Sequence, residues 1–250
     1  MLKRIILIEL TEHSRKKLYY FYLGTVILVF FISFAVLKIN NKPFDFTNIS
    51  TIIFQNLTQL ALIYSSSLLS SSVCKEYERR TLNWYKVRKI KPTHLIIGKF
   101  IYYLLATTIP VLFCYLMCSI VLLNIFETAI SIKEIISVCL VILCVFSFVT
   151  ALQIFISSSL RTSGASMIAI FISWLILSIV NTVVPFIKGF VAPFDMNSIQ
   201  NNFVSNILSV GINFSNTYIT QIAAIYLLPL IYTILLLYSA HFFVKKAVYK

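Results

Sequence analysis

The sequence predicts an all-α integral membrane protein with six transmembrane helices. Hydrophobic residues make up 59% of its 250 residues and charged residues only 12%, about half of the roughly 25% that is usual in soluble domains. The mean hydropathy is +0.91. The few basic residues gather beside long apolar runs, which is typical of loops at a membrane surface. We therefore expect one transmembrane domain over residues 1–250.

The chain begins with a segment that has the pattern of an interfacial helix. In residues 2–17, Leu2, Ile5 and Leu10 share one helical face and charged residues occupy the others, which predicts a helix lying in the membrane interface. The apolar run that follows is too long for a signal peptide and has no small-residue cleavage site, so we expect it to remain as the first span. With about 20 residues needed per crossing, the six spans are expected at about 18–37, 49–73, 95–123, 134–156, 165–187 and 218–244.

Polar residues inside the predicted spans mark faces that point into the protein, because polar groups in hydrocarbon must find partners. The second span carries Gln55, Asn56 and Gln59, and the fifth carries Asn181. These four residues are candidates for a translocation path. Packing between helices through polar and small residues is the alternative, and the serines of the second span favour it.

A further segment, 188–217, is too polar to span and too apolar for a free loop. Ile199, Phe203 and Ile207 recur in it at helical spacing. We expect a re-entrant helical segment at the outer surface.

The distribution of basic residues predicts the orientation. If the N-terminus is inside, the inner segments hold seventeen Lys and Arg residues and the outer segments hold four. An excess of positive charge marks the cytoplasmic side, so both termini are expected in the cytoplasm. The composition, rich in Lys, Asn and Ile and with only 5 Gly, is typical of AT-rich bacterial genomes, and we expect a bacterial cytoplasmic membrane protein.

The most charged stretch lies between the second and third spans, at 73–99. It holds eight of the chain's 21 Lys and Arg residues, and also Glu76 and Glu78. If Lys75–Arg88 forms one helix, Glu76 can pair with Arg79 or Arg80, and Pro92 ends that helix before the third span. An exposed helix with Trp and Arg is a candidate for insertion into a partner.

The order of residues in this stretch resembles the type-2 permease family of ATP-binding-cassette (ABC) exporters. Glu76-x-Glu78-Arg79-Arg80-Thr81-Leu82 is followed by Pro92 and by Gly98-Lys99, which matches the family's E-x-E-R-G-T-L segment, proline and G-K pair except that Arg80 replaces the glycine. The motif covers about a tenth of the chain, and the pattern of spans extends the resemblance. The residues expected to couple to the ATPase are Glu76, Tyr77, Glu78, Arg79, Arg80, Thr81, Leu82, Trp84 and Arg88.

This resemblance implies the membrane subunit of an ABC exporter that moves an amphipathic peptide, lipid or drug-like substrate outward by alternating access. It implies a second permease subunit, identical or different, and a separate ATPase subunit that binds ATP and magnesium. The chain itself contains no G-x-x-x-x-G-K-[ST] phosphate loop.

We expect no catalytic, cofactor or metal site in this chain. Its three His residues are scattered, without a Ser/His/Asp grouping. Cys114 and Cys118 share a helical face but lack further ligands nearby. No nucleic-acid motif accompanies the net charge of +13, so membrane lipid is the expected partner of the basic residues.

Two other functions remain open. One is a non-transporting membrane protein, such as an immunity or stress factor that binds a partner. The other is an ion-coupled carrier, although the predicted spans contain few of the carboxylates that such carriers usually need.

Overall fold

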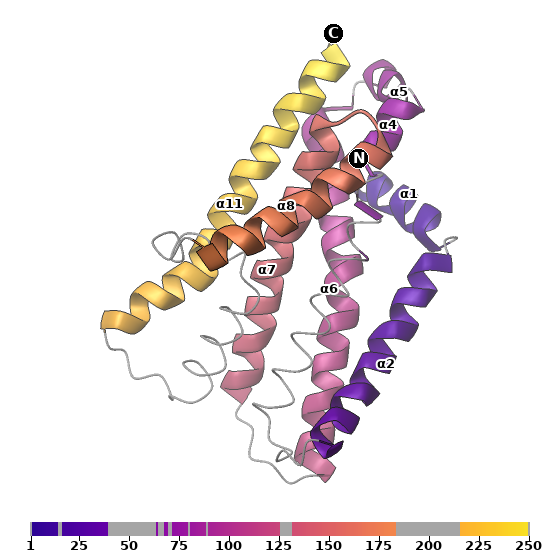
Figure 1. Ribbon diagram of the computed structural model, residues 1–250. Helices are drawn as coiled ribbons and strands as arrows, with labels where there is room; N and C mark the ends of the chain where they lie inside the picture. The colour runs from indigo at the N-terminus through magenta and orange to yellow at the C-terminus, as the bar shows by residue number, and fades with distance from the viewer. Residues whose placement is uncertain are drawn as a thin grey trace.

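The computed structural model is all-helical over the residues that it describes (Figure 1). These residues are 2–14, 17–39, 64, 68–69, 72–79, 81–88, 90–125, 132–183 and 216–249. The helices are α1 (Leu2–Ser14), α2 (Lys17–Ile39), α4 (Cys74–Glu78), α5 (Leu82–Val87), α6 (Pro92–Ile125), α7 (Ile132–Ser159), α8 (Ser163–Val183) and α11 (Asn216–Tyr249).

Within this described part, three helices are long and apolar enough to cross a membrane. Their apolar windows are Pro92–Val121 in α6, Ile142–Ser159 in α7 and Leu227–Ala247 in α11, at the positions of the predicted third, fourth and sixth spans. Helices α2 and α8 occupy the positions of the first and fifth spans, with shorter apolar stretches. Most of the predicted second span, and the predicted re-entrant segment 188–217 up to residue 215, lie outside the described residues.

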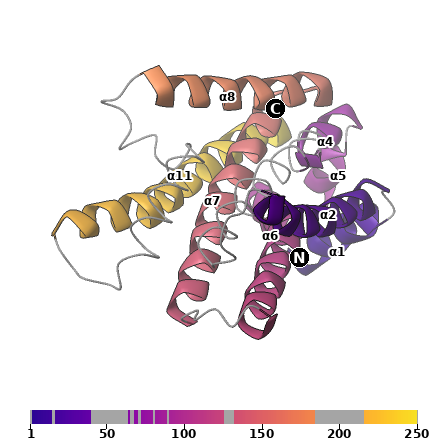
Figure 2. The same ribbon diagram turned by 60° about the horizontal axis from the view of Figure 1, so that its bottom comes forward.

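The centre of the molecule is formed by α6, α7 and α11, which pack against one another. Helix α2 packs on α6, and α8 crosses the outside of α7 (Figures 1 and 2). The buried core includes Phe146 and Phe148 of α7 and Val244 of α11. Tyr22 fixes α2 to α6, because its hydroxyl donates a hydrogen bond of 3.0 Å to the Thr107 carbonyl.

Helix α6 has one apolar face in the core and another exposed. Leu105, Ile109 and Phe113 recur at intervals of four residues and are exposed, whereas Tyr103 and Tyr115 are buried. A continuous apolar stripe on a protein surface marks contact with another apolar phase. In a helix of this length, the stripe fits contact with lipid chains.

One end of the bundle gathers segments that are far apart in the sequence. The N-terminal helix α1, the short helices α4 and α5, the turn between α7 and α8 and the C-terminal end of α11 all lie there (Figure 1). Helix α1 contacts α6, and α5 contacts α11. This end holds the described residues of the charged stretch.

Candidate functional site

The segment expected to be one helix over 75–88 is two short helices, so the single-helix prediction is wrong. Helix α4 ends at Glu78 and α5 begins at Leu82. The backbone N–H of Thr81 donates to the Glu76 carbonyl at 3.0 Å, and the Thr81 hydroxyl bonds the Glu76 carboxylate. A threonine side chain that bonds nearby polar groups competes with helical hydrogen bonding, and here it accompanies a turn. A continuous helix face from Tyr77 to Arg88 therefore does not form.

Lys99 lies at the centre of a buried ion cluster. Its side chain is on α6, about two turns from the start of that helix, and the residue is 1% exposed. The ammonium group forms ion pairs with Glu9 of α1 and, at 3.1 Å, with Glu76 of α4. It also donates to the Ser72 carbonyl at 3.0 Å. An ammonium group has three N–H donors, so these contacts match its full capacity.

Two tyrosines complete this group, which we call the Lys99 cluster: Glu9, Glu76, Lys99, Tyr85 and Tyr103. The Tyr103 hydroxyl donates to Glu9 Oε2 at 2.7 Å, and the Tyr85 hydroxyl donates to Glu76 Oε1 at 3.4 Å. Burial raises the pKa of Tyr85 to about 12, so its hydroxyl keeps its proton at neutral pH. Buried charges require both pairing and hydrogen bonds. The partners of these charges come from four helices, so the Lys99 cluster joins α1, α4, α5 and α6.

Gly98 explains how α1 reaches Lys99. A Cβ atom at Gly98 would lie 2.9 Å from Ile5 Cγ2 and 3.2 Å from Ile5 Cβ, too close for any residue larger than glycine without displacement. Ile5 and Glu9 are one helical turn apart on α1. The close approach of Ile5 to Gly98 therefore places Glu9 beside the neighbouring Lys99, which gives both residues of the G-K pair a structural role.

Arg79, one of the two arginines expected as partners of Glu76, does not pair with it. Instead, Nη1 of Arg79 lies 3.6 Å from Oε1 of Glu12 in α1. Both side chains of this pair are exposed, so its contribution to stability is small. Arg80 lies outside the described residues.

Glu78 binds the start of α8. Its Oε1 atom accepts hydrogen bonds of 2.7 Å from the backbone N–H of Ser163 and 3.0 Å from the Ser163 hydroxyl. Negative charge is favourable at a helix N-terminus, where backbone N–H groups lack helical partners. These hydrogen bonds, with a smaller effect of Lys75 and Arg79, lower the pKa of Glu78.

Replacement of Glu78 by alanine is expected to loosen the first turn of α8, because the Ser163 N–H loses its acceptor. Hydrogen exchange at Ser163 should accelerate in Glu78→Ala. A carboxylate with a lowered pKa stabilises the folded state above its ordinary pKa, and that effect is lost as the pH falls through the lowered value. Protection at Ser163 should therefore decline in acid in the natural protein.

Glu78→Gln is the control for this prediction, since its amide oxygen can still accept the hydrogen bond but does not titrate. Protection in Glu78→Gln should not change over the same pH range. Unchanged exchange at Ser163 in Glu78→Ala would contradict the capping role.

Helix α4 is anchored to the end of α7. Ser157 Oγ accepts hydrogen bonds from the backbone N–H groups of Val73 at 3.2 Å and Cys74 at 3.3 Å. The Cys74 thiol donates to the Ser157 carbonyl at 3.1 Å, and the Tyr77 hydroxyl donates to the Ser158 carbonyl at 3.1 Å. The motif is thus joined to α7 as well as to α1, α6 and α8.

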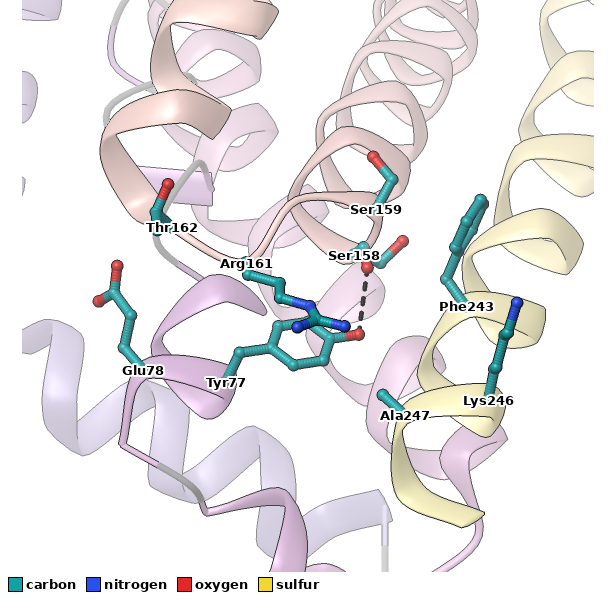
Figure 3. Close-up of a pocket in the computed structure, with 9 residues that line it drawn as sticks. All are labelled: Tyr77, Glu78, Ser158, Ser159, Arg161, Thr162, Phe243, Lys246 and Ala247. Carbon is teal, nitrogen blue, oxygen red and sulfur yellow. Dashed lines mark hydrogen bonds between the residues drawn. The ribbon is translucent and has the colours of Figure 1, made fainter. Parts of the chain in front are cut away.

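An open cavity of about 720 Å³ lies beside this anchor, between α4, the α7–α8 turn and the end of α11 (Figure 3). We call it the Arg161 cavity. It is lined by Tyr77, Glu78, Ser158, Ser159, Arg161, Thr162, Phe243, Lys246 and Ala247. Burial raises the pKa of Tyr77 to about 12, and Arg161 acts in the opposite direction, so the Tyr77 phenol is neutral at physiological pH.

The other predicted site residues are placed as follows. Leu82 is buried, while Arg88 and its neighbour Val87 are exposed. The backbones of Trp84 and Asn181 lie in α5 and α8, but their side chains are outside the described part. Gln55, Asn56 and Gln59 lie outside the described residues.

Among the described residues, no group of three or more His, Cys, Asp or Glu is arranged to hold a metal ion.

The sequence analysis did not predict the buried charge of Glu9 or the roles of Tyr103 and Ser157. The sequence holds one indication that Glu9 is buried, because Glu9 lies one helical turn after the apolar residue Ile5.

A scan against family models and searches of curated proteins and of solved structures found no match to this chain.

Proposed function

We propose that this chain is the membrane-spanning permease subunit of an ATP-driven ABC exporter in a bacterial cytoplasmic membrane. It moves an amphipathic peptide, lipid or drug-like substrate outward, and a separate ATPase subunit supplies the energy with ATP and magnesium. It works with a second permease subunit, either identical or different. The observation that carries this proposal is the attachment of the E-x-E-R-x-T-L segment to the ends of the long apolar helices.

Those attachments suit a segment that transmits force. Glu76 is joined to α6 and, through Lys99, to α1, while Glu78 is joined to α8. A displacement of α4 and α5 by a partner would therefore move the ends of several helices together. In the proposed cycle, closure of the ATPase pair on ATP supplies this displacement, and the permease interface opens outward.

The surface available to the partner is at α5. Val87 is 81% exposed although it is apolar, and Arg88 beside it is also exposed. An exposed apolar residue with an adjacent arginine fits the centre of a protein contact.

Substitution of α5 residues is expected to uncouple the ATPase. Trp84→Ala and Val87→Asp should each weaken docking, and Trp84→Ala should cost about 2 kcal/mol, the scale of a hot-spot residue. ATP hydrolysis and transport by the reconstituted complex should fall together, while membrane insertion stays normal. Val87→Ile is the matched control, because it keeps an apolar side chain, and it should retain activity. Normal coupling in both Trp84→Ala and Val87→Asp would remove the main support for an ABC permease.

We also propose six spans with both termini in the cytoplasm. In a variant without the five native cysteines, new cysteines at positions 42 and 133 should react with an impermeant thiol reagent from outside. Cysteines at 89 and 161 should react only after the membrane is opened. The arrangement of α1, the α7–α8 turn and the C-terminal end of α11 at one end of the bundle supports this expectation (Figure 1). Labelling of position 89 from outside would be incompatible with it.

The energy source separates this proposal from its alternatives. Transport that requires ATP and the partner ATPase supports the permease. Transport that requires only a proton or sodium gradient indicates an ion-coupled carrier. Partner binding without transport indicates an immunity or stress protein.

A further inference from the structure

The described lining of the Arg161 cavity has more positive than negative charge. Arg161 and Lys246 line it from the α7–α8 turn and from α11, and both are exposed. Within the described part of the chain, neither forms an ion pair. Among the described residues of the lining, Glu78 is the one acidic residue, and its carboxylate is bonded to Ser163 at the start of α8. Figure 3 places Glu78 beside Thr162, on the opposite side of the cavity from Lys246.

The cavity lies where two apolar helices end. The apolar window of α7 ends at Ser159 and that of α11 ends at Ala247, and both of these residues line the cavity. A membrane-spanning helix passes from hydrocarbon to water at the end of its apolar stretch. We therefore expect the cavity to lie at the depth of the lipid phosphate groups.

The chemistry of the walls changes with position in a way that suits an amphipathic ligand. Arg161, Lys246 and the hydroxyl group of Thr162 line the cavity and offer donors. Phe243 offers an apolar wall from α11 and contacts Phe155 of α7 edge-on at 5.9 Å between ring centroids. The charged donors suit a phosphate group, and the aromatic wall suits the acyl chains attached to it.

We propose that the Arg161 cavity binds a phosphate group, and that the headgroup of an anionic phospholipid supplies it. Arg161 and Lys246 contact the phosphate oxygens, the Thr162 hydroxyl donates a hydrogen bond, and the first acyl segment lies against Phe243. Arginine provides a planar set of donors that suits phosphate. The bound lipid would join the α7–α8 turn to the end of α11, beside the anchor of α4. This inference does not depend on the identity of an ATPase partner.

Native mass spectrometry of the full chain, purified in a neutral detergent, tests the proposal. Phosphatidylglycerol, phosphatidylcholine and inorganic phosphate are titrated separately. We expect phosphatidylglycerol to bind at least tenfold more tightly than phosphatidylcholine, and inorganic phosphate to bind weakly. The double variant Arg161→Gln/Lys246→Gln should lose about thirtyfold in affinity for phosphatidylglycerol, the effect expected for two basic residues near an anionic headgroup.

Lys245→Gln is the matched control, because Lys245 is exposed on the same helix and does not line the cavity. It should bind phosphatidylglycerol within twofold of the natural protein. A high-salt titration of the unaltered protein provides a second measurement that needs no variant, and added salt should weaken binding by screening.

Four outcomes would overturn the proposal. The first is an equal loss in Lys245→Gln, which would indicate unspecific attraction. The second is inorganic phosphate binding as tightly as phosphatidylglycerol, which would make free phosphate the ligand. The third is an unaffected double variant. The fourth is displacement of the lipid by an equal concentration of an acidic peptide, which would assign the cavity to a protein segment.

Discussion

Replacement of Lys99 by methionine is expected to destabilise the protein by about 3–5 kcal/mol, the cost of breaking a buried ion pair by removal of one partner. Methionine has a similar length but no charge, so Glu9 and Glu76 would remain close together without a cation between them. The Ser72 carbonyl would also lose its donor. Thermal unfolding in detergent should show a large decrease in the midpoint temperature.

Two variants control this prediction. Lys91→Met removes a positive charge from an exposed position just before α6 and should have little effect. The triple variant Lys99→Met/Glu9→Gln/Glu76→Gln removes the uncompensated carboxylates and should recover much of the lost stability, because neutral groups cost less to bury than charges. If Lys99→Met unfolds at the same temperature as Lys91→Met, the Lys99 cluster does not stabilise the fold.

Replacement of Ser157 by alanine is expected to have the second largest effect. The hydroxyl oxygen accepts hydrogen bonds from two backbone N–H groups, those of Val73 and Cys74, and both of these residues are 0% exposed. Each buried group left without a partner costs about 1–3 kcal/mol. The loss should release α4 from α7 and expose the segment that follows Ser72 to added protease.

Ser159→Ala is the matched control for Ser157→Ala. Ser159 lies two residues further along α7, is exposed, and donates a 2.9 Å hydrogen bond to the Ile156 carbonyl of its own helix. Its removal should change neither the unfolding temperature nor the rate of proteolysis. Equal proteolysis of the two variants would show that Ser157 does not hold α4.

The positions of the long helices follow from the apolar runs alone. The expected ranges 95–123 and 134–156 became α6 (Pro92–Ile125) and α7 (Ile132–Ser159), because helix formation in an apolar solvent satisfies every backbone group locally. The start of α6 at Pro92 is also readable, since proline is favoured in the first helical turn. These features depend on neighbours in the sequence.

The Lys99 cluster was not predicted, because its members are separated by many residues. Glu9 and Lys99 meet only through the close approach of Ile5 to Gly98, and no local pattern specifies that approach. The break after Glu78 was missed for a different reason. The sequence from 75 to 88 favours a helix, but the hydroxyl of Thr81 bonds Glu76, and tertiary hydrogen bonds anchor α4 to α7 and α8.

The Lys99 cluster also imposes an order on biosynthesis. Glu9 leaves the ribosome some ninety residues before Lys99, so the first helix is made long before its positive partner exists. Chains emerge N-terminus first, and a carboxylate without a cation is unfavourable in a buried position. We therefore expect helix α1 to stay at the water-facing surface until the beginning of α6 has been translated. A nascent chain arrested before residue 99 would keep α1 undocked, and docking becomes possible once the first turns of α6 have emerged.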